Sequence, residues 1–185
     1  MSDLKRFAFD DLPPALSEAL EARVSRLGYF GEFFQCAAHQ PEALKAFVDF
    51  TELAKAGVPK KVVEVVALTC AGWMGNAYET NQHERLSIRS GFGHDWVRAV
   101  ERLEPEDQAE MSPDEQLVQR FVLTTLDSRG HASADLFEAV RTTLGDACAV
   151  AILMIVGRYV VHGLFVNTLG LAPPVPSIWE DGFQG

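Results

Sequence analysis

The stretch Pro59–Gly91 decides how this chain folds, and it reads PKKVVEVVALTCAGWMG followed by NAYETNQHERLSIRSG. Its first half is an apolar run with a single acid, Glu64, and such a run predicts a buried helix. Gly72 and Gly75 favour a break after it, because glycine weakens a helix through its backbone entropy. A second helix is predicted to begin at Asn76, which is a good N-cap residue.

Three polar residues of the second helix, Asn76, Glu79 and His83, are spaced i, i+3 and i+7 and therefore share one face. In a functional interpretation, Glu64 and this face converge on one pocket. In a structural interpretation, Glu79 is the acid of a capping box or forms a surface i, i+4 pair with His83. Glu64 itself lies either on an exposed stripe or in the core with a partner, because an unpaired buried charge is costly.

The frame Glu64-x11-Asn76-x2-Glu79-x3-His83 resembles a motif of the carboxymuconolactone decarboxylase family, which includes the alkylhydroperoxidase D-like proteins. Redox members of that family carry Glu-x11-Cys-x2-Cys-x3-His. In this chain the acid and the histidine are present, and Asn76 and Glu79 occupy the two cysteine positions. The chain therefore resembles a non-redox member that lacks the CxxC pair.

A second pattern, Tyr78-Glu79-x3-His83, resembles the Tyr-Glu-Trp-x2-His pattern of the non-redox members, with Thr80 at the tryptophan position. Weaker similarities lie at Leu12-Pro13-Pro14, at His39-Gln40-Pro41 and at Phe165–Gly170. The resemblance implies an all-α, alkylhydroperoxidase D-like helical fold of about eight or nine helices that forms oligomers.

The resemblance to the decarboxylases also implies a cofactor-independent lyase, which removes CO2 from a small carboxylated lactone or related ring acid. His83 is the natural proton carrier, because the pKa of histidine lies near neutrality. Glu64 would orient His83 or act as the acid. Tyr78 and Asn76 would donate hydrogen bonds to a developing oxyanion, and Glu79 completes the expected substrate-binding face.

Two other chemistries fit the sequence less well. Thiol peroxidase activity needs a reactive thiolate and a second thiol, but Cys36, Cys70 and Cys148 lie far apart, and Cys70 is most simply a buried apolar residue. Glu79 and His83 could supply two metal ligands from one helical turn, but no third ligand follows at a suitable spacing, so no metal site is expected. A non-catalytic helical oligomer is the remaining alternative.

The last helix is predicted to run from Gly145-Asp146 to about Leu169 and is apolar on nearly every face. Arg158 and His162 interrupt it, so a buried helix or an oligomer seam is expected and a membrane span is not. Arg158 either pairs with a core acid such as Glu64 or, together with His162, binds the carboxylate of a substrate.

Composition sets the remaining limits. With 185 residues and 48% hydrophobic content, the chain 1–185 is expected to form one domain, with a linker near 104–112 and an extended tail at 171–185. The formal net charge is −10, from 16 basic and 26 acidic residues, and no basic patch indicates nucleic-acid binding.

Location and assembly follow from composition and from the resemblance. A sparse, odd set of cysteines and the lack of a signal-peptide pattern predict a cytoplasmic protein. The resemblance, together with the apolar last helix, predicts a homo-oligomer, a trimer or a hexamer.

Overall fold

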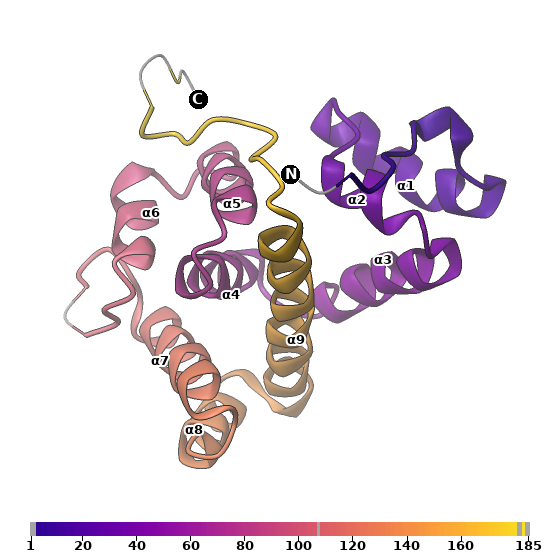
Figure 1. The fold of residues 1–185 in the computed structure, drawn as a ribbon. Coiled ribbons are helices and arrows are strands. Elements are labelled where there is room, and N and C mark those ends of the chain that lie inside the picture. Colours follow the sequence, from indigo (N-terminus) through magenta and orange to yellow (C-terminus); the bar gives the residue numbers. More distant parts are fainter. Residues whose placement is uncertain (1–2, 107, 181–182, 184–185) are drawn as a thin grey trace.

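The computed structural model describes residues 3–106, 108–180 and 183, and within these ranges it holds nine α-helices, one short 3-10 helix and no strand. The prediction of an all-α fold with eight or nine helices is confirmed. In Figure 1, α9 runs through the middle, with α1 to α3 on one side and α4 to α8 on the other. The elements are η1 (Phe9–Asp11), α1 (Pro14–Leu27), α2 (Glu32–Ala37), α3 (Pro41–Lys55), α4 (Lys60–Trp73), α5 (Ala77–Arg89), α6 (His94–Glu101), α7 (Pro113–Ser128), α8 (Ala134–Leu144) and α9 (Asp146–Leu169).

Two apolar clusters hold the helices together. The larger one joins α4 to α6, α7, α8 and α9 and includes the fully buried Val66, Phe121 and Ile152. The smaller one joins α1, α2 and α3 to the ends of α5 and α9, where Tyr78 and Val166 lie. Full burial of one such aliphatic or aromatic side chain stabilises the fold by about 1.5–3 kcal/mol. The two clusters meet along α9, which contributes residues to both.

The break between α4 and α5 lies slightly later than the sequence indicates. Gly72 was expected to interrupt the helix, but it lies inside α4, which continues to Trp73. The chain reverses at Gly75, whose φ of 61° belongs to the left-handed region that glycine adopts without strain. Asn76 then caps α5, because its side-chain oxygen accepts a hydrogen bond from the backbone N–H of Glu79 at 3.2 Å.

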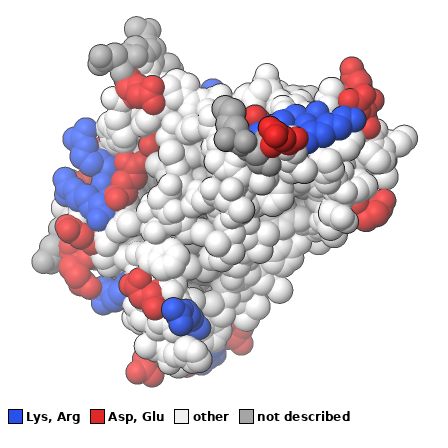
Figure 2. All heavy atoms as spheres, viewed as in Figure 1, with Lys and Arg blue, Asp and Glu red and all other residues white. Residues whose placement is uncertain are grey.

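Helix α9 is long and apolar enough to span a membrane by length and composition, but half of its most apolar window is buried inside the fold. Its outer side exposes a row of large apolar side chains, and Figure 2 shows that the surface over the middle of the molecule carries few charged residues. The exposed apolar residues of α9 are Val150, Leu153, Met154, Val161 and Leu164.

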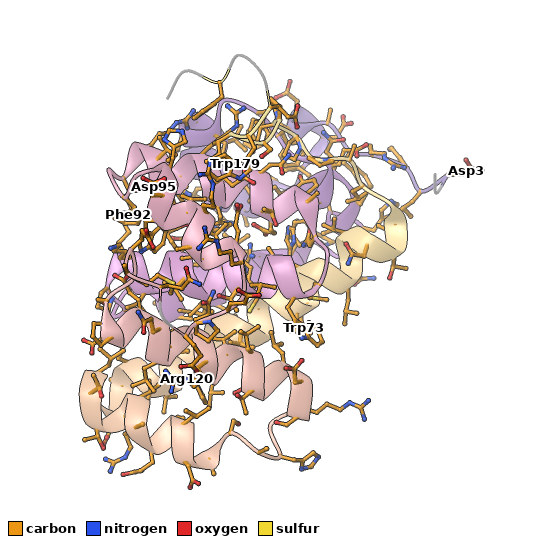
Figure 3. All side chains as sticks on the ribbon, turned by 90° about the vertical axis from the view of Figure 1, so that its left-hand side faces the viewer. Asp3, Trp73, Phe92, Asp95, Arg120 and Trp179 are labelled. Carbon is orange, nitrogen blue, oxygen red and sulfur yellow. The ribbon has the colours of Figure 1, made fainter. Side chains whose placement is uncertain are left out.

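The C-terminal tail packs on its own chain, against α5 and α6. Asn81 donates a hydrogen bond to the backbone oxygen of Val175, and Glu84 accepts one from the backbone N–H of Ile178. Trp179 lies near Asp95 of α6 in Figure 3 and donates its ring N–H to Glu101. The tail prediction also covers positions 181–182 and 184–185, and the linker prediction covers position 107, all of which lie outside the described residues.

Candidate functional site

The interior of the molecule holds a cluster of polar side chains where four helices meet. Such a cluster is unusual in a core, because buried polar and charged groups require partners. Helix α3 contributes its last residue, α4 one acid, α5 an acid and a histidine, and α9 three residues on its inner face. The members of the cluster are Lys55, Glu64, Glu79, His83, Arg158, Tyr159 and His162.

Glu64 and His83 form the centre of this cluster. Oε2 of Glu64 lies 2.6 Å from Nδ1 of His83, and the two residues are only 2% and 6% exposed. Of the two partners that the sequence left open for Glu64, His83 is therefore the one observed, and Arg158 pairs elsewhere. Burial opposes protonation of His83, but the carboxylates of Glu64 and Glu79 outweigh it and raise the pKa of His83.

Glu79 is bound by three side chains at once. Its Oε1 accepts a hydrogen bond from Nη1 of Arg158 at 2.8 Å and lies 3.1 Å from Nε2 of His162. Its Oε2 lies 3.2 Å from Nε2 of His83. The interpretation of Glu79 as a surface residue is wrong, since Glu79 is 4% exposed. Although its backbone N–H is capped by Asn76, its side chain is directed to these three partners.

The charges around Glu79 keep it ionised. Burial alone would raise the pKa of Glu79, but the imidazole of His162 at 3.1 Å and the positive charge of the Arg158 guanidinium hold it well below its usual range, His162 acting near pH 7 as a hydrogen-bond donor. Burial, together with the positive charge of Arg158, lowers the pKa of His162 to about 3, so this imidazole is neutral near pH 7. A neutral His162 donates Nε2–H to Glu79 and leaves Nδ1 as an acceptor.

Two buried nitrogens of this cluster have no hydrogen-bond partner among the described residues. They are Nε of Arg158 and Nδ1 of His162. Buried polar atoms are usually satisfied, so an unpaired donor and an unpaired acceptor within one polar cluster need an explanation, and a bound polar ligand is one.

Tyr159 links His83 to a lysine that the sequence analysis did not single out. The hydroxyl of Tyr159 lies 3.0 Å from Nε2 of His83 and accepts a hydrogen bond from Nζ of Lys55 at 3.0 Å. A continuous line of hydrogen bonds thus runs from Lys55 through Tyr159 and His83 to Glu64. Tyr159 stands three residues before His162, and residues at i and i+3 share a helix face, so its place on the polar side of α9 could have been noticed in the sequence.

The two expected oxyanion donors bind other groups. Tyr78 lines the cavity, but its hydroxyl accepts the backbone N–H of Phe33 at 3.4 Å and packs against Gly31. Burial raises the pKa of Tyr78, so it stays a phenol. Asn76 is engaged as the cap of α5. The hydroxyl that lies beside His83 is that of Tyr159.

A cavity of about 350 Å³ opens onto the cluster. Its lining includes six lysine and arginine residues but only three acids, Glu52, Glu64 and Glu79, although the whole chain has a formal net charge of −10. A cavity lined mainly by one sign of charge concentrates ligands of the opposite sign. The six basic residues are Arg23, Arg26, Lys55, Lys60, Arg89 and Arg158.

This helical arrangement is the fold of the alkylhydroperoxidase D-like proteins. The chain is similar to the apo debrominase Bmp8, with 14% identity over 95% of this chain and 94% of that one and a TM-score of 0.80. It is also similar to an uncharacterized peroxidase-related protein from Ralstonia eutropha JMP134, described as an alkylhydroperoxidase AhpD core, with 17% identity over 94% of both chains and a TM-score of 0.78.

A third similar structure is ATU0492 from Agrobacterium tumefaciens, a protein of unknown function described as a putative antioxidant defence protein AhpD. It shares 19% identity over 76% of this chain and 96% of its own, with a TM-score of 0.65. No protein-family model matches the chain, and no curated protein sequence matches it. At these identities the likeness establishes the fold.

Proposed function

We propose that this protein is a cofactor-independent acid–base enzyme of the carboxymuconolactone decarboxylase type, a carbon–carbon lyase acting on a small carboxylated lactone or ring acid. The observation that carries the proposal is the buried Glu64–His83 pair, which contacts Tyr159 and lines a cavity whose charged lining residues are mainly basic. The sequence resemblance and the shared fold agree with it. The fold accommodates small ring compounds, since a variant of the debrominase Bmp8 was solved in complex with 2,3,4-tribromopyrrole.

The basic lining, which includes Arg158, would hold the carboxylate of the substrate. When the carbon–carbon bond to the carboxyl group breaks, CO2 leaves and the electron pair stays on the ring as an enolate. Protonation of the ring carbon then completes the reaction. Because Glu64 occupies Nδ1 of His83, the proton is delivered from Nε2, beside Tyr159.

The raised pKa of His83 suits this role. A raised pKa favours the protonated, proton-donating form of His83, and the bond to Glu64 fixes the orientation of the ring. Tyr159 would relay the proton or donate a hydrogen bond to the enolate oxygen.

Turnover of a panel of small γ-lactone carboxylates, followed by CO2 release, tests the proposal. For any compound turned over, His83→Ala is expected to lower the rate by about 100-fold or more, the usual range for a general acid–base group. His94→Ala, at an exposed histidine outside the cavity, is the control. Full turnover by a folded His83→Ala variant would remove His83 from the mechanism.

A further inference from the structure

Lys55 differs from the other lysine of its helix. Its side chain is half-buried at the end of α3, lines the cavity, and has Nζ 3.0 Å from the Tyr159 hydroxyl and 5.2 Å from the centre of the Tyr159 ring. Within the described ranges, this amine forms no ion pair with a carboxylate. Lys45, by contrast, binds Asp49 at 2.7 Å.

The surroundings of Lys55 favour the neutral amine. Burial lowers the pKa of Lys55 to about 8, and the neighbouring charge of Arg158 acts in the same direction. An ordinary lysine, with a pKa of about 10.4, has only about 0.4% of its amine neutral at pH 8. About half of the Lys55 amine carries a free lone pair at that pH, and a desolvated lysine beside a cation is a typical nucleophile for carbonyl carbons.

We propose that Lys55 forms an imine with small oxo acids, whose carboxylate is held by Arg158 and the basic lining while their ketone or aldehyde carbon lies at the lysine amine. Two observations support it: the hydrogen bond from Lys55 to Tyr159, and the place of Lys55 and Arg158 in the lining of one cavity. The inference goes beyond the proposed lyase function, in which no amine acts as a nucleophile.

The reaction balances with the groups that are present. The Nζ lone pair adds to the carbonyl carbon, and the π electrons of the C=O bond move to oxygen, which takes a proton. The nitrogen loses a proton to the Tyr159 hydroxyl or to water, giving a carbinolamine. A second protonation of the oxygen lets it leave as water while the nitrogen lone pair forms the C=N bond of an iminium ion. The iminium nitrogen then loses its proton, which replaces the one that the oxygen took, and the imine results. One amine and one carbonyl therefore give one imine and one water, without any oxidant or reductant.

Tyr159 is the proton carrier for these steps. Its hydroxyl accepts from Lys55 and contacts Nε2 of His83, so a proton taken from the amine can pass toward the Glu64–His83 pair and return to the carbinolamine oxygen. Burial and its surroundings raise the pKa of Tyr159 well above its usual value, so the group acts as a neutral relay and not as a phenolate.

Borohydride trapping tests the inference on the intact protein. The full chain is incubated with pyruvate or acetoacetate as probe, reduced with sodium borohydride, and analysed by intact mass and peptide mapping. We expect one adduct per chain, on Lys55, with a yield that rises through about pH 8, near the pKa of the amine. Acetone, which has the carbonyl but no carboxylate, should give at least 10-fold less adduct.

Matched variants separate this inference from the proposed function. Lys55→Arg keeps the charge and removes the nucleophile, so the adduct should fall more than 10-fold, whereas Lys45→Arg on the same helix should label like the parent. His83→Ala, which shortens the proton relay, should slow the labelling but leave its position at Lys55 unchanged, even where lactone turnover is lost. Labelling spread over several lysines, or a folded parent chain that yields no Lys55 adduct with either probe, would overturn the inference.

Discussion

Oε2 of Glu64 lies 2.6 Å from Nδ1 of His83, so an acid from the middle of α4 and a histidine from α5 form one buried pair. The valines that surround Glu64 in sequence leave it no exposed stripe. Helix α4 is buried over the whole range 62–71. The acid is therefore held in the core by its partner, and the pair is the natural target for mutagenesis.

Glu64→Gln is expected to keep the fold, lower the pKa of His83 and reduce turnover. Glutamine has nearly the shape of glutamate but removes the negative charge that favours protonated His83. The pKa is measured by NMR titration of the His83 ring in parent and variant. A variant whose His83 titrates like the parent and whose turnover is unchanged would show that the pair plays no part in proton handling.

The same pair gives a pH-dependent term in stability. Because the pKa of folded His83 is raised above its unfolded value of about 6.5, its stabilisation is fully present below pH 6.5 and is lost as the pH rises through the folded pKa. His162 acts in the opposite sense, since its lowered pKa gives stability that is lost as the pH falls from about 6.5 toward about 3. In urea denaturation, the stability gap between parent and Glu64→Gln should therefore shrink as the pH rises.

Glu79→Gln is expected to cost roughly 3–5 kcal/mol of stability, because it leaves the buried Arg158 guanidinium without its partner at 2.8 Å. Adding Arg158→Met removes the stranded charge and should recover most of the loss. Denaturant unfolding of both variants measures these effects. Glu138→Gln, at an exposed pair with Arg141, is the control and should leave the midpoint unchanged. Equal losses in the single and double variants would contradict the account.

Peroxide turnover with a dithiol reductant is expected to be absent or feeble. Asn76 and Glu79 stand where the redox members of the family that the sequence resembles carry cysteine, and burial raises the pKa of the fully buried Cys70, which disfavours its thiolate. The rate is compared between the parent and Cys70→Ser. Fast peroxide turnover by the parent that Cys70→Ser abolishes would favour the peroxidase function over the lyase function.

Self-association through the outer face of α9 is expected, because this face exposes a row of large apolar side chains. Sedimentation should report a trimer or a hexamer for the parent. Val161→Glu, in the middle of the row, should shift the protein toward smaller species, whereas Thr142→Glu, on an exposed position of α8, should not. A parent chain that is monomeric at micromolar concentration would refute the prediction.

The sequence predicted best those features that depend on a single helix. The apolar run around Glu64 required a buried helix, and the spacing from Asn76 to His83 gave the cap of α5 and its polar face. Two features of the site could not be predicted, because they depend on how the helices are rotated against one another, and no local sequence pattern encodes that rotation. One was the partner of Arg158, which is Glu79 and not Glu64.

The other feature concerned the hydrogen-bond donors near His83. Tyr78 and Asn76 have the right chemistry, but their oxygens accept hydrogen bonds at the start of α2 and at the cap of α5, and the hydroxyl nearest His83 is that of Tyr159. Nothing in the sequence indicated that Lys55 belongs to the site, because a lysine at the C-terminal end of a helix is ordinarily a solvated residue that complements the helix dipole. Only the packing of α3 on α9 brings it to Tyr159.

The hydrogen-bonded line from Lys55 to Glu64 draws one group from each of four helices, through Tyr159 and His83. Because each member of the line is hydrogen-bonded to the next, the position of one side chain sets the surroundings of the others. A shift of any one helix therefore changes the acidity of groups carried by the other three. The perturbed pKa values in this interior therefore depend on tertiary structure, and local unfolding of any one of the four helices would return them toward their ordinary values.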